Sequence, residues 1–315
     1  MKRLATFPNA NAAVPHLALI AVQLMFVTWP IFGKIVLTAI PSTGIVAFRV
    51  VGSAIAFTIL QRSLKRERKI RSRDFARLAL YSLLGVVLNQ FLFVKGLSLT
   101  TVINTTLLGT TIPVFTLLIS ISLGYDRLTI RKTLGIMLAA SGVIYLLYPE
   151  RHFTSDTMVG NLLILLNSLS YGAYIALSKD MIKRYGALNV LAWIFIFGCI
   201  ATVPVGGYAL SGSNLSQAGL GIWLALLYII LVPTVGAYYL NAWALARVEP
   251  STVAVYIYLQ PLIAFALAPL ILNEKWNPRT WLASALIFAG VAVVTWRIRS
   301  QAIAEISEHP EALSH

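Results

Sequence analysis

Charged residues are scarce in this chain. Of its 315 residues, 11% are Asp, Glu, Lys or Arg and 58% are hydrophobic, whereas soluble domains usually carry about 25% charged residues. So few charges cannot cover a soluble globule of this size. The apolar residues come in blocks of about 20, the length of helix that crosses roughly 30 Å of hydrocarbon. The composition therefore excludes an ordinary soluble domain and predicts a polytopic membrane protein.

Cysteine, histidine and acidic residues are also few. The single cysteine, Cys199, can form no disulfide within the chain, and in its apolar block it is expected to behave as a small buried hydrophobic residue. All 11 Asp and Glu are expected at span ends, in loops or in the tail. No carboxylate pair, Ser-His-Asp set or metal-ligand cluster is then available at membrane depth. We therefore expect no catalytic residues, metal or cofactor, and hence not an enzyme.

Ten membrane-spanning helices are predicted from the apolar blocks and from the Pro, Gly and charged residues that separate them. The connections are short, and no loop is long enough to hold a separate soluble domain. The predicted spans are 16–38, 43–61, 75–95, 100–122, 129–148, 158–178, 188–210, 219–246, 250–272 and 279–298.

The ten spans are predicted to form two copies of one unit. A shift of 148 residues pairs Asp126 with Glu274, Arg131 with Arg279, Leu134 with Leu282, Gly142 with Gly290, and Pro113 with Pro261. Because five is an odd number of spans, the second copy must be inverted relative to the first, as in alternating-access carriers. We predict an all-α membrane protein with a five-helix repeat in 1–150, an inverted repeat in 151–299, and a cytoplasmic tail in 300–315. The repeats are expected to surround a central cavity.

Basic residues are distributed unevenly over this topology. If the N-terminus is cytoplasmic, 19 of the 25 Lys and Arg lie on the cytoplasmic side and four on the opposite side. This asymmetry follows the positive-inside rule, so both termini are predicted to be cytoplasmic in a multi-pass protein of the inner (plasma) membrane. The basic run at 62–73 is expected to lie beside anionic lipid headgroups. It therefore accounts for much of the +14 net charge without a nucleic-acid partner.

Polar and aromatic side chains recur on single faces of six predicted spans. Lipid cannot satisfy amides and phenols, so these faces are expected to point inward and line one cavity. For each residue alone, a hydrogen bond between helices is the alternative. The predicted substrate-binding residues are Gln23, Trp29 and Lys34 in the first span, Asn89 and Gln90 in the third, Asn104 in the fourth, Tyr171 and Tyr174 in the sixth, Tyr239 and Trp243 in the eighth, and Tyr256 and Gln260 in the ninth.

Two further features accompany these faces. In the eighth span a neighbouring pair, Tyr238 and Asn241, is polar as well. Arg49 lies about six residues into the second span, roughly 9 Å deep at 1.5 Å per residue. Either it satisfies backbone carbonyls of a neighbouring helix, or it belongs to a positive outer vestibule that attracts a carboxylate or phosphate.

The fifth and tenth spans carry small residues instead of polar ones, such as Gly135 and Gly142 in the fifth and Ala289 and Gly290 in the tenth. Small faces let helices approach closely. These spans are therefore predicted to serve packing or a homodimer contact, and not the transport pathway.

The ninth span carries the sequence PSTVAVY at 250–256 and LQPLIA at 259–264, followed by LNE at 272–274 and GV at 290–291. The first half has a looser version, with IPVF at 112–115 and LGYD at 123–126. These runs resemble the EamA repeat of the drug/metabolite transporter superfamily, and the likeness covers residues 16 to 298. Asp126 stands where the family usually has Glu.

The resemblance implies a ten-helix carrier with inverted halves, whose cavity is formed mainly by spans one, three, four, six, eight and nine. We expect an alternating-access carrier that exports a small amphipathic metabolite, with amino acids, aromatic ones included, as the first expectation. Efflux of drug-like compounds or nucleobases and, in another class, a membrane-embedded lipid-modifying enzyme are the alternatives. The lack of deep acids favours facilitated diffusion or exchange over proton coupling. The expected partners are a small-molecule substrate and the lipid bilayer.

Overall fold

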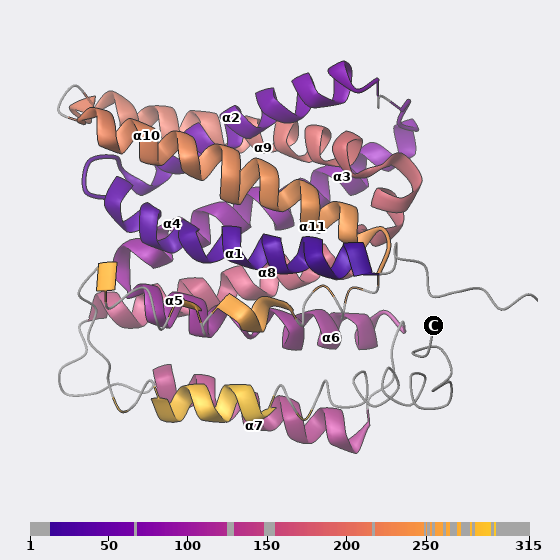
Figure 1. The fold of residues 1–315 in the computed structure, drawn as a ribbon, viewed down its shortest axis with the longest axis vertical. Coiled ribbons are helices and arrows are strands. Elements are labelled where there is room, and N and C mark those ends of the chain that lie inside the picture. Colours follow the sequence, from indigo (N-terminus) through magenta and orange to yellow (C-terminus); the bar gives the residue numbers. More distant parts are fainter. Residues whose placement is uncertain are drawn as a thin grey trace, which may run out of the picture.

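The protein is a bundle of helices that run side by side (Figure 1). The computed structural model describes residues 13–65, 68–124, 129–147, 155–215, 218–248, 250, 253, 256–260, 263–264, 270–271, 278, 281–290 and 293. No strand occurs among these residues. The α-helices are α1 (Ala13–Val36), α2 (Ser42–Ser63), α3 (Phe75–Ser82), α4 (Asn89–Leu99), α5 (Val102–Gly109), α6 (Ile112–Ser122), α7 (Ile130–Leu147), α8 (Ser155–Tyr185), α9 (Ala187–Ser211), α10 (Leu220–Ile229) and α11 (Ala237–Leu245).

Seven helical stretches are long and apolar enough to cross a membrane. They correspond to predicted spans one to four and six to eight. Their bounds are Val14–Val36, Ser42–Ser63, Ser72–Leu99, Val102–Ser122, Thr157–Tyr185, Ala187–Ser211 and Leu220–Leu245. Large apolar side chains lie on their outer surface, including Leu17, Ile200 and Leu220, which are 63%, 71% and 75% exposed. Such an apolar exterior suits a lipid environment.

Two of these stretches contain a wide π-helical turn. In the third span, η3 (Leu83–Leu88) joins α3 to α4, and in the eighth span η5 (Ile230–Gly236) joins α10 to α11. A shift of 148 residues carries 83–88 onto 231–236, so the two wide turns occupy equivalent positions in the predicted repeats. Wide turns of this kind often mark functional sites in helices.

The fifth and tenth predicted spans are seen as shorter helical pieces. α7 has 18 residues, and the helix Trp281–Gly290 packs against it. A Cβ added to Gly142 would lie 2.9 Å from the carbonyl oxygen of Ala283. Figure 1 shows the two pieces crossing at one edge of the bundle. The small-residue faces therefore contact each other within one chain.

The number of ten spans stays a prediction. Most of the ninth span, 250–272, lies outside the described residues, and so does the predicted tail, 300–315. The repeat boundaries at 150 and 299, the inverted orientation of the second repeat and a homodimer through spans five and ten also stay predictions.

Close helix contacts position the central elements. α8 contacts α4, α5 and α6, while α2 packs along α9. Gly96 of α4 faces Gly160 of α8, and a Cβ added to either residue would lie 3.0 Å from the carbonyl oxygen of the other. Side chains at these two positions would push the helices apart, so the glycines set the spacing of α4 and α8.

Candidate functional site

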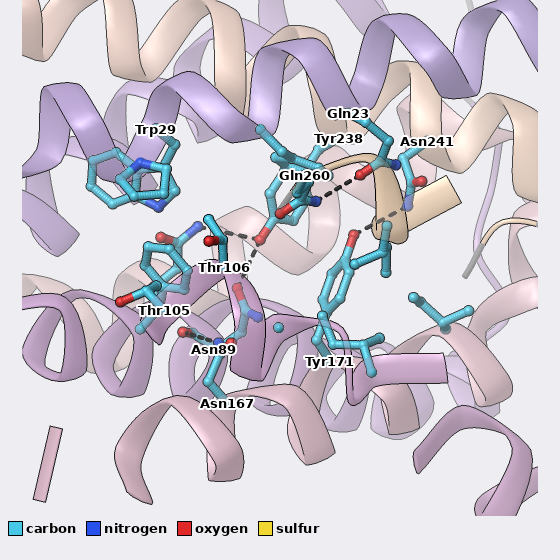
Figure 2. A pocket seen from close by; sticks show the side chains of 18 of the residues that line it. Gln23, Trp29, Asn89, Thr105, Thr106, Asn167, Tyr171, Tyr238, Asn241 and Gln260 are labelled. Carbon is cyan, nitrogen blue, oxygen red and sulfur yellow. Dashed lines mark hydrogen bonds between the residues drawn. The ribbon is translucent and has the colours of Figure 1, made fainter. Parts of the chain in front are cut away.

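A cavity with apolar walls and several polar side chains lies between the helices, about half-way along α1 (Figure 2). Its volume is about 70 Å³, measured as the space open to the centre of a water molecule. At about 10–15 Å³ per water molecule by this measure, it has room for roughly five. The lining residues are Gln23, Phe26, Trp29, Pro30, Arg49, Asn89, Gln90, Phe93, Thr105, Thr106, Gly109, Ile112, Asn167, Tyr171, Ile175, Tyr238, Asn241, Ile257 and Gln260.

Tyr238 of α11 lies at the centre of the polar groups that surround this cavity. Its hydroxyl lies 2.9 Å from Asn89 Oδ1 and 3.3 Å from the carbonyl oxygen of Gly85, so that it can donate to one of them. It also accepts from Gln90 Nε2 at 3.4 Å. Gln90 and Tyr238 are 148 residues apart and therefore occupy equivalent positions in the predicted repeats. Equivalent residues touch only close to a two-fold axis, so this contact supports a pseudo-two-fold axis beside the cavity.

Arg49 of α2 is buried beside the same groups, with 2% of its surface exposed. Its Nε and Nη2 donate to Thr234 Oγ1 at 3.0 and 2.8 Å, and its Nη1 donates to Gln90 Oε1. The guanidinium carbon lies 3.8 Å from the ring centroid of Trp29. Thr234 belongs to η5, and its hydroxyl donates to the carbonyl oxygen of Ile229 at 2.7 Å. Arg49 therefore connects α2 to the wide turn of the eighth span and to α4.

Three further hydrogen bonds join different helices around the cavity. Gln260 Nε2 donates to Gln23 Oε1 at 2.6 Å, Asn241 Nδ2 donates to the hydroxyl of Tyr171 at 3.1 Å, and Asn167 Nδ2 donates to the carbonyl oxygen of Asn89 at 2.7 Å. Figure 2 shows Trp29 on one side of the cavity, Tyr171 and Asn241 on the other, and the Tyr238 hydroxyl between them. The walls therefore offer both aromatic faces and amide groups.

Six of the twelve predicted binding residues line the cavity, namely Gln23, Trp29, Asn89, Gln90, Tyr171 and Gln260. That these residues bind a substrate stays a prediction.

The other six predicted residues lie outside the lining, namely Lys34, Asn104, Tyr174, Tyr239, Trp243 and Tyr256. Asn104 is buried and donates to Thr100 Oγ1 at 3.2 Å. Tyr174 stacks on Tyr171, with 5.8 Å between ring centroids. Trp243 lies under the guanidinium of Arg247, and the Tyr256 hydroxyl is 2.8 Å from His16 Nδ1.

Several lining residues were not among those predicted to bind substrate. Asn167 lies one turn before Tyr171 on the polar face of the sixth span, and that face was a usable signal. In the eighth span the neighbouring pair Tyr238 and Asn241 lines the cavity in place of Tyr239 and Trp243. Both faces are polar, so helical periodicity alone could not choose between them, and η5 changes the number of residues per turn just before them.

A second polar cluster, the Asp74 cluster, lies where the chain passes from α2 to α3. The Tyr185 hydroxyl donates to Asp74 Oδ2 at 2.6 Å. Arg184 Nη1 is 3.5 Å from Asp74 Oδ2, and Arg77 Nη1 is 3.9 Å from Oδ1. Asp74 itself is 1% exposed. None of these four residues lines the cavity.

Metal-ligating groups are not gathered around the cavity or elsewhere in the described part of the chain. No group of three or more His, Cys, Asp or Glu residues that could hold a metal ion occurs there. The chemistry of the cavity is therefore that of amides, hydroxyls, aromatic rings and one guanidinium.

Known proteins match this chain over most of its length. An "Uncharacterized transporter" of Archaeoglobus fulgidus is 28% identical over 89% of this chain and 96% of its own. A WAT1-related protein of Arabidopsis thaliana is 25% identical over 81% of this chain and 80% of its own. One solved crystal structure is 17% identical, with a TM-score of 0.65, and covers 90% of this chain and 97% of that one; this likeness concerns the fold.

A family model matches the chain twice, over residues 14–148 and 158–296. The two matches cover the two halves of the chain, and their ends lie 148 residues apart. The chain belongs to the EamA-like transporter family of the drug/metabolite transporter superfamily.

Proposed function

We propose that this transporter is an alternating-access carrier that exports a small amphipathic metabolite, with amino acids, aromatic ones included, as the first class of cargo. The observation that carries the proposal is a cavity whose walls come from both matched segments. Gln23, Asn89 and Gln90 belong to the first segment, and Tyr171, Tyr238 and Gln260 belong to the second. Transporters built from repeats typically bind cargo at the interface of the repeats.

The chemistry of the walls fits an amphipathic molecule. Trp29 and Phe93 stack at 5.7 Å between ring centroids, and Phe26 and Tyr171 add aromatic surface. Amide groups of Gln23, Asn241 and Gln260 can hydrogen-bond a polar end. Apolar walls with a few placed polar groups are usual for small-molecule sites. Nucleobases, which also combine a planar ring with amide-like edges, are the second cargo class that these walls favour.

The size of the cavity supports a cycle of opening and closing. Room for roughly five water molecules is less than an aromatic amino acid needs, so the walls must separate to admit it. Hydrogen bonds such as Gln260–Gln23, Asn167–Asn89 and Gln90–Tyr238 join the two matched segments across the cavity. We propose that these bonds break and reform as the two repeats rock, with η3 and η5 as the points where spans three and eight bend.

Counterflow in proteoliposomes tests the proposal. Vesicles loaded with unlabelled L-phenylalanine are expected to take up labelled L-phenylalanine transiently above equilibrium, because a carrier that returns loaded exchanges one molecule for another. Flux without such stimulation would indicate a channel, and chemically altered product would indicate an enzyme. Adenine replaces phenylalanine in a parallel experiment for the second cargo class.

The predicted topology is part of the same proposal, because export requires a defined orientation. The concentration of basic residues on one side supports cytoplasmic termini. A reporter fused to the C-terminus is expected to give a cytoplasmic signal in cells, and a signal from the opposite side would contradict this orientation.

A further inference from the structure

Arg49 differs from every other residue that lines the cavity. Among the described residues of the lining it is the one whose side chain carries a formal charge. It is also 2% exposed. A buried charge is costly unless an opposite charge or several hydrogen bonds compensate it. The environment of Arg49 therefore needs an explanation.

The partners of Arg49 within the described chain are all neutral. They are the amide of Gln90, the hydroxyl of Thr234 and the ring face of Trp29. The acids whose side chains the structure describes are Asp74, which is held in the Asp74 cluster, and Asp180, which is exposed. Neither forms an ion pair with the guanidinium, so this positive charge at the cavity has no carboxylate beside it from the described residues.

The guanidinium is also only partly used as a donor. Arginine has five N–H groups, and three of those of Arg49 are directed at Thr234 and Gln90. One N–H on Nη1 and one on Nη2 remain. The ring of Trp29, the amide of Gln90 and the hydroxyl of Thr234 hold the group in place, so the two remaining donors are fixed before any ligand arrives. A fixed pair of guanidinium donors suits a carboxylate, which accepts two such hydrogen bonds.

We infer that Arg49 receives the carboxylate of the cargo, while the aromatic walls hold an apolar or aromatic body. This inference rests on the proposed function and narrows it to cargo with one carboxylate. One positive charge in the lining matches one carboxylate. A phosphate group, with about 1.5 to 2 negative charges at neutral pH, would leave charge uncompensated. Cationic cargo without an acid group is disfavoured by the same charge.

The test compares three probes that share a phenyl ring. L-Phenylalanine and 3-phenylpropionate carry a carboxylate, whereas L-phenylalaninamide carries a neutral amide in its place. Each is titrated as a competitor of counterflow in proteoliposomes and as a ligand that raises the melting temperature of the purified protein. For the wild-type protein we expect both carboxylates to bind at least about tenfold more tightly than the amide, which corresponds to about 1.4 kcal/mol.

Variants at Arg49 sharpen the comparison. In Arg49→Gln the preference for carboxylate over amide is expected to fall to less than about twofold. Arg49→Lys keeps the positive charge but lacks the planar pair of N–H donors, so we expect an intermediate preference for carboxylate over amide. Arg247→Gln is the matched control, because Arg247 also lies over a tryptophan ring, at 3.7 Å from its centroid, but is exposed and outside the cavity lining. It should keep the wild-type preference.

The outcomes separate this inference from the proposed function. If the wild-type protein shows counterflow but binds the acids and the amide equally tightly, the role of Arg49 is overturned while the carrier function stands. The same holds if Arg49→Gln keeps the full preference for carboxylate over amide. If Arg49→Gln does not fold, Arg49→Lys takes its place, and an undiminished carboxylate preference in Arg49→Lys would then contradict the role of Arg49. If none of the three probes supports or inhibits counterflow, this inference and the first cargo class both fail, and the adenine experiment then decides whether the protein is a carrier of the second class.

Discussion

The cavity lining and the Asp74 carboxylate are both buried, whereas the two arginines beside Asp74 are exposed, and the two sites are built in opposite ways. In the Asp74 cluster a carboxylate faces a phenol and two guanidinium groups. In the cavity one guanidinium contacts neutral groups, and the cavity space of about 70 Å³ lies beside them. Opposite charges that compensate each other at the end of a helix stabilise the fold. Polar groups that adjoin an open space are available to a ligand. The comparison therefore separates polar residues that maintain the structure from polar residues that can act on cargo.

The strongest way to sharpen this contrast is to remove one hydroxyl from the Asp74 cluster. Tyr185→Phe deletes the hydrogen bond to Asp74, and a hydrogen bond to a charged group contributes about 1.5–3 kcal/mol. We expect the free energy of unfolding to fall by about 2 kcal/mol, measured by denaturation in detergent, while the KM of counterflow stays unchanged. Tyr208→Phe is the control, because Tyr208 is 86% exposed. A changed KM in Tyr185→Phe would mean that the Asp74 cluster takes part in transport.

The central hydroxyl of the cavity is the next test. Tyr238→Phe leaves Asn89 Oδ1 without its donor and Gln90 Nε2 without its acceptor. An orphaned buried polar group costs about 1–3 kcal/mol, so we expect the counterflow rate to fall about tenfold. The neighbouring change Tyr239→Phe lies outside the lining and should leave the rate near that of the wild-type protein. Equal losses of counterflow rate in Tyr238→Phe and Tyr239→Phe would contradict the assignment of Tyr238, and not Tyr239, to the cavity.

A smaller effect is expected at the Gln260–Gln23 pair. Gln260→Ala removes one amide that hydrogen-bonds across the cavity, and the loss of one neutral hydrogen bond is worth about 1 kcal/mol. We expect the KM of counterflow to rise about fivefold with little loss of protein in the membrane. Tyr256→Phe is the comparison, because the Tyr256 hydroxyl is directed at His16 and its side chain is outside the lining. A larger effect at Tyr256 than at Gln260 would place the binding surface elsewhere.

The smallest effect is expected where a lining residue turns its polar atom away from the cavity. The Thr105 hydroxyl donates to the carbonyl oxygen of Thr101 at 2.8 Å, within its own helical segment. Thr105→Val keeps the shape of the side chain, so we expect less than about a twofold change in KM, given the small net value of such bonds. A tenfold change would indicate that the hydroxyl reorients to meet the cargo.

Much of the architecture follows from the sequence because burial in lipid leaves few choices. The apolar blocks predict the seven spans that the structure describes in full. Because lipid cannot satisfy amide groups, the amide side chains of Gln23, Asn89 and Gln260 in apolar helices are predicted to point inward. The pairing of α7 with Trp281–Gly290 follows from their small residues, since Gly142 permits the close approach.

Other features could not be obtained from spacing. A helical period of 3.6 residues does not reveal the wide turn η5. The sequence therefore predicts that Tyr239 and Trp243 line the cavity, whereas Tyr238 and Asn241 do so in the structure. Arg49 was predicted with two alternatives, because its depth along one helix says nothing of Gln90 or Thr234, which lie 41 and 185 residues away in the chain. Contacts of this kind depend on how helices are arranged around each other.

The wide turns η3 and η5 have a consequence for variation among related chains. Each holds one residue more than an α-helical turn would, and one residue corresponds to about 100° of rotation around a helix axis. A wide turn accommodates one extra residue without rotating the helix that follows, whereas a further insertion beside Leu83–Leu88 would swing Asn89 and Gln90 relative to the preceding half of the span. Mean hydropathy would hardly change, yet amides would exchange places with leucines. A one-residue insertion here is therefore expected to do more harm than many substitutions, because it would change which side chains line the interior.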